Sequence, residues 1–142
     1  MESQYVPHIY TDKELKQFFA ETENCHYNSQ APWRHVIMPV FFRLIYICGL
    51  RVSEARLLKV GDVDLSNGIL TINNSKKDNS RLVPISSSVT KRCLKYSANV
   101  HQNSNPDDYY FPALDKKPMT LGNVYKNFRK FLWQAGISHG GK

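Results

Sequence analysis

The sequence predicts an α+β domain that is mainly α-helical and carries a small three-stranded antiparallel sheet. Apolar residues recur at helical spacing in four segments, residues 12–22, 33–47, 88–99 and 120–135, and this periodicity is typical of helices that bury one face. Between the second and third segments, residues 63–85 alternate short apolar runs with polar turns, which is typical of antiparallel strands. A chain of 142 residues is long enough for one domain with its own core.

The first helix is predicted from its cap and its apolar stripe. Thr11 and Glu14 stand at the spacing of a capping box, in which each side chain binds the main-chain amide of the other residue. Leu15, Phe18 and Phe19 then follow at i, i+3 and i+4. One face of this helix is therefore expected to pack on the core.

Residues 33–47 give the strongest helix prediction in the chain. Apolar side chains occupy nearly all sides of this segment, which predicts a central, buried helix. Tyr46 is expected to lie in the core with its neighbours. Gly49 follows the last turn and suits a helix C-terminus, because glycine adopts the left-handed conformation at low cost.

The remaining helices make specific packing predictions. A short helix is expected over residues 52–58, with Leu57 and Leu58 facing inward. The apolar segment 109–111 is expected to dock on the core, and an exposed apolar patch is expected near Leu132 and Trp133. The inward-facing residues expected in the last two long helices and just beyond them are Val89, Cys93, Leu94, Val100, Val124, Phe128, Phe131 and Leu132.

The sheet is predicted from three short runs and the turns between them. Residues 63–65 and 69–72 are expected as strands around the turn 66–68. Residues 81–85 are expected to return along the second strand after a polar turn at 76–80.

The charge balance favours a polyanionic partner. Lys and Arg number 19 against 12 Asp and Glu, which gives a net charge of +7. Nucleic acid is the commonest partner of such a surface, and a generic basic protein is the alternative. Cys25, Cys48 and Cys93 form no CxxC pair, which argues against a disulfide framework or a zinc ribbon and favours a reducing cytosol.

Other chemistries lack their motifs. The sequence contains no GxxxxGK[ST], HExxH or GxSxG segment, and its five histidines have no metal-ligand spacing. Its longest apolar run falls far short of the ~20 residues that span a membrane. No metal, cofactor, membrane or small-molecule substrate is therefore expected.

Arg51 is the first residue that suggests a function. It begins the short helix after Gly49, where the partial positive charge of a helix end makes a cation mildly unfavourable. A bound phosphate would reverse that cost, and a guanidinium can bind phosphate through two hydrogen bonds. The alternative is an ion pair with a carboxylate, and Glu54 stands about one turn away.

Two motifs, in order and at a suitable separation, then carry a family resemblance. The first is Gly-Leu-Arg-Val-Ser-Glu at residues 49–54, followed by Gly-Asp-Val-Asp at residues 61–64. The second is Ser-Lys-Lys-Asp-Asn-Ser-Arg-Leu-Val-Pro at residues 75–84. Together they resemble the first signature box and the lysine-bearing strand–turn–strand of the tyrosine recombinases, the phage integrase family. The resemblance covers roughly residues 5–142.

The resemblance implies two catalytic residues. Arg51 would hold the scissile DNA phosphate and stabilise the charge of its pentavalent transition state. Lys76 would be the general acid that protonates the leaving 5′ oxygen. Lys77 competes with Lys76, which is favoured because its spacing to residues 81–84 matches the family better; the local alternative is that both are merely solvated turn lysines.

The same resemblance gives four further residues supporting roles. Lys77 and Arg81 are expected to contact DNA backbone phosphates, which positions DNA without reading its sequence. Glu54 is expected to orient Arg51 or lock the fold. Asp62, before the first strand, is likewise expected to be structural.

The family also needs residues that this sequence lacks. It contains no His-x-x-Arg box, and its eight tyrosines do not lie in the context of the family's nucleophile. Residues 1–142 are therefore expected to be the N-terminal portion of a partial catalytic domain, without the second box, the nucleophile or the N-terminal core-binding domain. This chain alone is expected to be inactive.

The resemblance implies site-specific DNA recombination by a phage or mobile-element enzyme, through a 3′-phosphotyrosyl intermediate. The complete enzyme is expected to act on double-stranded DNA as a homotetramer, without a cofactor, in the cytoplasm. Two alternatives stay open: a non-catalytic DNA-binding remnant or regulator derived from an integrase, and a structural protein.

Overall fold

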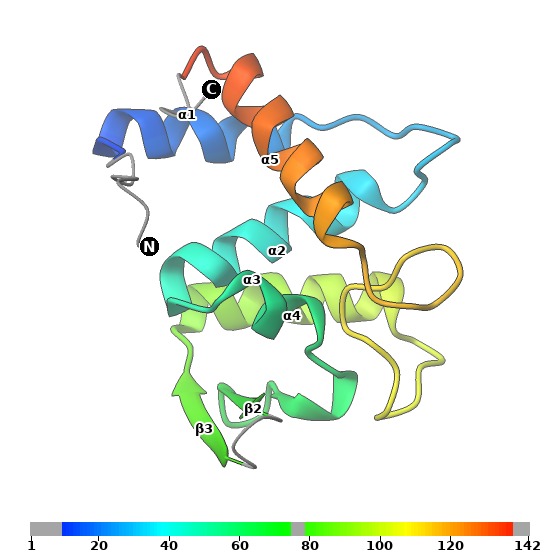
Figure 1. Ribbon diagram of the computed structural model, residues 1–142. Coiled ribbons are helices and arrows are strands. Elements are labelled where there is room, and N and C mark those ends of the chain that lie inside the picture. Colours follow the sequence, from blue (N-terminus) through cyan, green and yellow to red (C-terminus); the bar gives the residue numbers. More distant parts are fainter. Residues whose placement is uncertain (1–9, 75–78, 138–142) are drawn as a thin grey trace, which may run out of the picture.

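The computed structural model describes residues 10–74 and 79–137, which form a helical domain with a three-stranded antiparallel sheet at one end (Figure 1). This confirms the predicted α+β class. In chain order the elements are α1 (Asp12–Glu23), α2 (Arg34–Cys48), α3 (Val52–Arg56), the 3₁₀ turn η1 (Val60–Asp62), β1 (Val63–Asp64), β2 (Ile69–Asn74), β3 (Asn79–Pro84), α4 (Ser87–Val100) and α5 (Leu121–Gln134).

Helix α2 is the centre of the domain. It packs against α1, α3 and α4, and Phe41 and Leu44 are completely buried. α5 packs against α1 and reaches the same core through Phe131, whose ring centroid lies 6.2 Å from that of Phe42. The prediction of a buried central helix is confirmed, and so is its end at Gly49, which has φ +67°.

Tyr46 contradicts the prediction that it lies in the core. More than half of its side chain is exposed, because the last turn of α2 reaches the surface between α1 and α5. There its ring packs against Phe19, with centroids 5.8 Å apart, and it helps to line a small apolar surface cavity. Such a position lets the ring contact carbon while the hydroxyl stays in water.

The cap of α1 forms as predicted. The Glu14 amide donates to Thr11 Oγ1 at 3.1 Å, and the Thr11 amide donates to Glu14 Oε1 at 3.0 Å. Two amides that have no partner within the helix are thereby satisfied.

The short helix α3 ends earlier than expected, and the packing of Leu57 was predicted wrongly. Leu58 is buried, but about half of Leu57 is exposed. Because the helix stops at Arg56, the two leucines leave helical spacing and point to different sides. The carbonyl of Leu58 accepts a hydrogen bond from the Tyr110 amide at 2.7 Å, which joins this segment to the 109–111 loop.

The sheet has the order β1-β2-β3. Val63 pairs with Leu70, and Ile72 pairs with Arg81. Gly68, with φ +66°, makes the first turn possible because a left-handed backbone suits glycine. Leu70 and Ile72 are buried, so one face of the sheet closes the core while the other meets solvent.

Helix α4 buries Val89, Cys93 and Tyr96, whereas 52% of Leu94 is exposed. The prediction for Leu94 was therefore wrong, and Tyr96 was missed. Residues 89, 93 and 96 share one face at i, i+4 and i+7, and Leu94 lies about 100° away from Cys93. The Tyr96 hydroxyl donates to the Tyr110 carbonyl at 2.6 Å, which allows a polar atom to be buried.

Tyr110 and Phe111 are both buried, which confirms that the 109–111 segment docks on the core. His101 Nε2 also donates to the Tyr110 carbonyl, at 2.8 Å. Further along the loop, the amide of Val60 donates to the Asp108 carbonyl at 2.8 Å. The loop after α4 thus supports the segment that leads from α3 into the sheet.

Helix α5 places Val124, Phe131 and Leu132 in the core, with Phe128 partly buried. The expected apolar patch is therefore smaller than predicted: Trp133 is largely exposed, but Leu132 is covered. Adjacent residues of a helix point about 100° apart, so one can face inward and the next outward.

Truncation of a core leucine should cost far more than truncation of an exposed one. Leu44→Ala removes a side chain that is 0% exposed and should lower the free energy of unfolding by about 2–5 kcal/mol. Leu94→Ala, the matched control, should lower it by less than about 1 kcal/mol. Urea unfolding of both variants measures the difference; equal losses would contradict the packing of α2 and α4.

Candidate functional site

Arg51 lies on the surface, immediately after the turn that ends α2. Its backbone is extended, with φ −72° and ψ 152°, as the residue that precedes α3. The side chain is exposed. Among the residues that the structure describes, none forms a hydrogen bond or ion pair with the Arg51 guanidinium. A cation held in this way is available to an external anion.

Glu54 binds the main chain of Arg51 rather than its guanidinium. The Arg51 amide donates to Glu54 Oε1 at 2.9 Å. Both carboxylate oxygens also accept from Arg81, with Nη1 to Oε2 at 2.8 Å and Nη2 to Oε1 at 3.0 Å. The sequence suggested an Arg51–Glu54 ion pair as the alternative to phosphate binding, but in the structure the ion pair is made by Arg81.

This ion pair shifts both partners toward their charged forms. Hydrogen bonds from Arg81 lower the pKa of Glu54, and the backbone bond from Arg51 lowers it further. The carboxylate in turn raises the pKa of Arg81. Glu54 is therefore ionised at neutral pH, and its charge is matched within the site.

Asp62 holds the other strand of the same hairpin. Its Oδ1 accepts from Asn73 Nδ2 at 3.2 Å, and its Oδ2 accepts from the Lys59 amide at 3.1 Å. Asp62 thus ties η1 to β2, while Glu54 ties α3 to β3. The structure brings Arg51, Glu54 and Arg81 into one cluster and places Asp62 in a separate structural contact.

Lys76 and Lys77 lie outside the described residues. The strands on either side of them are paired up to Asn74 and Asn79. Both lysines therefore stay assigned by sequence alone.

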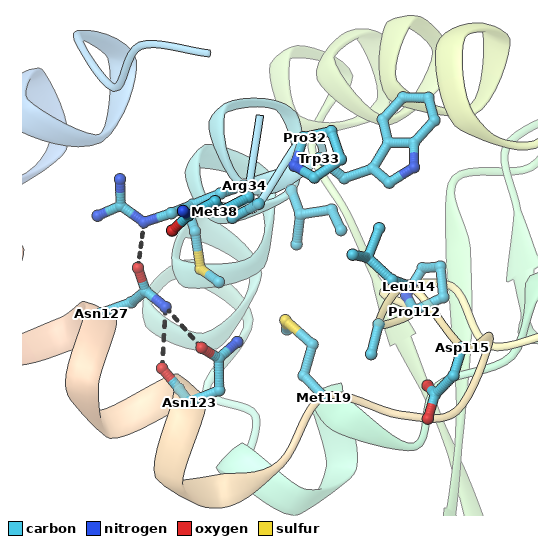
Figure 2. Close-up of a pocket in the computed structure, with 14 residues that line it drawn as sticks. Pro32, Trp33, Arg34, Met38, Pro112, Leu114, Asp115, Met119, Asn123 and Asn127 are labelled. Carbon is cyan, nitrogen blue, oxygen red and sulfur yellow. Dashed lines mark hydrogen bonds between the residues drawn. The ribbon is translucent and has the colours of Figure 1, made fainter. Parts of the chain in front are cut away.

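A cavity of about 460 Å³ lies at the other end of α2, between that helix, α5 and the loop before α5 (Figure 2). Arg34 lines it and donates from Nε to Asn127 Oδ1, and its guanidinium carbon lies 4.8 Å from the centre of the Phe131 ring. Asn127 in turn donates to the Asn123 carbonyl at 2.9 Å. Sequence reasoning did not single out the half-buried Arg34, because an arginine at a helix start carries no distinctive spacing. The predicted site residues that the structure describes, Arg51, Glu54, Asp62 and Arg81, do not line this cavity.

Two further properties concern the described part of the chain. Its residues bring together no group of three or more His, Cys, Asp or Glu that could hold a metal ion. No helix there is long and apolar enough to cross a lipid bilayer.

Comparison with known proteins gives the family. The sequence model of the phage integrase family matches residues 9–141, which is almost the whole chain. This protein therefore belongs to the phage integrase family.

Two curated relatives fit this assignment. The chain is 27% identical over 146 residues to the putative integrase/recombinase y4rB of Sinorhizobium fredii, covering 94% of this chain and 46% of that protein. It is 32% identical over 97 residues to the tyrosine recombinase XerD of Proteus mirabilis, covering 66% and 31%. The chain thus spans less than half the length of these relatives.

Solved structures show the same fold. The XerA recombinase superposes with a TM-score of 0.75 at 20% identity, over 97% of this chain and 46% of that one. The catalytic domain of bacteriophage HP1 integrase superposes with a TM-score of 0.55 at 19% identity, over 94% and 61%. The fold is therefore that of part of a tyrosine recombinase catalytic domain.

The Glu54–Arg81 pair predicts a loss of stability on the acid side. Because folding lowers the pKa of Glu54 below its ordinary value of 4.5, the pair stabilises the fold above that pH. The stabilisation is lost as the pH falls through the lowered pKa. Arg81 stays charged throughout this range. The difference in unfolding free energy between wild type and Arg81→Ala should therefore be largest near neutral pH and vanish once the pH has fallen well below the lowered pKa.

Urea unfolding at a series of pH values measures this difference, which should be modest because Arg81 is half exposed. Arg129→Ala is the control, since it removes an exposed arginine that forms no ion pair with the described residues. A difference for Arg81→Ala that stays constant from neutral pH to well below the lowered pKa of Glu54 would contradict the pair.

Proposed function

We propose that these residues are the N-terminal part of the catalytic domain of a tyrosine recombinase that carries out site-specific DNA recombination for a phage or mobile element. Family membership supports the class of protein. The observation that carries the proposal is the exposed guanidinium of Arg51, which bonds none of the residues that the structure describes and whose main chain is held by Glu54.

The reaction is a phosphoryl transfer that needs no cofactor. A tyrosine outside these 142 residues attacks a DNA phosphate, so that a tyrosyl O–P bond forms and the bond to the 5′ oxygen breaks. Arg51 stabilises the charge on the phosphorane, and Lys76 gives a proton to the leaving 5′ oxygen. The covalent 3′-phosphotyrosyl link retains the bond energy, so the strands rejoin without ATP.

The proposed partner is double-stranded DNA. A net charge of +7 favours a polyanion. Structural neighbours include the XerH recombinase bound to its difH substrate and the Tn1549 integrase in complex with transposon end DNA. The complete enzyme acts as a homotetramer on two DNA sites, in the cytoplasm of the host.

Loss of Arg51 should slow the chemistry strongly and spare the fold. In the complete protein, Arg51→Ala should slow formation of the covalent DNA adduct about 100- to 1,000-fold. The adduct is measured as a shifted band on a denaturing gel, with a nicked duplex that carries the mapped recombination site. The unfolding temperature should stay unchanged, because the guanidinium bonds no described residue. Arg51→Lys keeps the positive charge but lacks the planar guanidinium that can bind a phosphate through two hydrogen bonds. It should therefore recover only part of the rate. A wild-type rate in Arg51→Ala would show that Arg51 takes no part in the chemistry, and a wild-type protein that forms no adduct would favour the non-catalytic alternative.

The 142-residue chain alone should bind DNA without cleaving it. Binding to duplex DNA should weaken as salt rises, with a logarithmic slope of about −0.9 for each phosphate neutralised, and no covalent adduct should appear. Fluorescence anisotropy over a salt series measures the slope. Flat or absent binding would favour the structural alternative, and a covalent adduct would place a nucleophile within these residues.

A further inference from the structure

Glu54 is shared between two arginines that belong to different sequence motifs. Its Oε1 accepts the Arg51 amide, and its two oxygens accept Nη1 and Nη2 of Arg81 at 2.8 and 3.0 Å. Only 12% of the Glu54 side chain is accessible, against 49% for Arg81. The carboxylate is thus enclosed between α3 and β3, while Arg81 covers it from the solvent side.

The sheet fixes Arg81 in this place. Arg81 is directly opposite Ile72 in the β2–β3 pairing, and opposed residues of an antiparallel pair share one face. Ile72 is buried, so this face is the one turned toward the helices. β2 also contacts α3, which brings the face that carries Arg81 against Glu54.

A carboxylate beside a phosphate-binding arginine opposes that arginine in two ways. Its negative charge repels the phosphate. At a separation of three residues it can also reach the guanidinium of Arg51 itself, because side chains at i and i+3 can pair. A guanidinium paired in this way would have fewer donors for DNA.

We infer that Arg81 is a positioning residue for Arg51: by binding both oxygens of Glu54, it keeps the carboxylate away from the Arg51 guanidinium, which stays free for the DNA phosphate. The inference rests on the proposed recombinase function. It replaces the direct contact of Arg81 with the DNA backbone that the sequence predicted.

A double-mutant cycle in the complete protein tests the inference. Arg81→Ala should slow adduct formation about 10- to 100-fold, because the released carboxylate captures Arg51. Glu54→Gln removes the charge but keeps an oxygen that can accept the Arg51 amide. Combining the two changes should restore the rate to within about threefold of Glu54→Gln alone, because no carboxylate remains to capture Arg51.

Two further variants separate positioning from charge and from folding. Arg92→Ala removes an arginine of similar exposure, 42%, that pairs with Glu23 at 2.6 Å, and it should leave the rate near that of wild type. Arg81→Lys keeps a charge beside Glu54 but lacks the planar fork that binds both oxygens. Its rate should lie between those of wild type and Arg81→Ala, and it replaces the alanine variant if that one unfolds.

DNA affinity gives the decisive comparison. Positioning predicts that any loss of affinity in Arg81→Ala disappears when Glu54→Gln is combined with it, because no carboxylate remains to capture Arg51. A direct phosphate contact predicts weaker binding, a salt slope reduced by about 1, and the same loss with or without Glu54→Gln. Weaker binding that does not depend on Glu54 would overturn the inference but not the proposed function. Rate losses from the two substitutions that multiply in the double variant would do the same. A wild-type protein that forms no adduct would instead overturn the proposed function, and the inference with it.

Discussion

The burial of α2 is the constraint on which the rest of this structure depends. Its apolar surface is too wide for one neighbour, so α1, α3 and α4 all pack on it, and α5 adds Phe131 to the same core. The helix ends where the neighbouring helices that bury it end. Gly49 turns the chain there, and Arg51 leaves the core at a fixed position two residues later. The place of the candidate phosphate-binding residue is thus set by hydrophobic packing, which fixes position far more firmly than a surface ion pair does.

Electrostatics then decide what Arg51 is free to do. Glu54 could have bound the guanidinium of Arg51, but the structure gives its oxygens to the Arg51 amide and to Arg81. A surface ion pair of this kind contributes little to stability. Its role here is to fix geometry, because the Glu54 carboxylate joins α3, the helix that begins after Arg51, to β3, the strand that follows the predicted lysine turn. Asp62 makes a parallel connection to the other strand through Asn73.

The loop after α4 packs against the segment between α3 and β1 and holds it in place. Tyr110 is buried, and its carbonyl accepts hydrogen bonds from Tyr96 and His101. Its own amide binds the Leu58 carbonyl. The segment between α3 and β1 therefore lies on a polar network inside the protein, and such networks favour one geometry because each unsatisfied member would be costly.

The sequence by itself determined the α+β class, the long helices, the hairpin and the family, because these depend on local periodicity, turn residues and short motifs. It pointed to Arg51 as a catalytic candidate for the same reason, and that assignment stays a prediction. It misplaced Tyr46, Leu57 and Leu94, since exposure near a helix end depends on where neighbouring elements stop. It could not choose a partner for Glu54 either: Arg51 is three residues away and Arg81 is 27. Only the folded sheet brings the distant arginine to the carboxylate, so the tertiary structure alone decided which arginine is paired and which is left for a ligand.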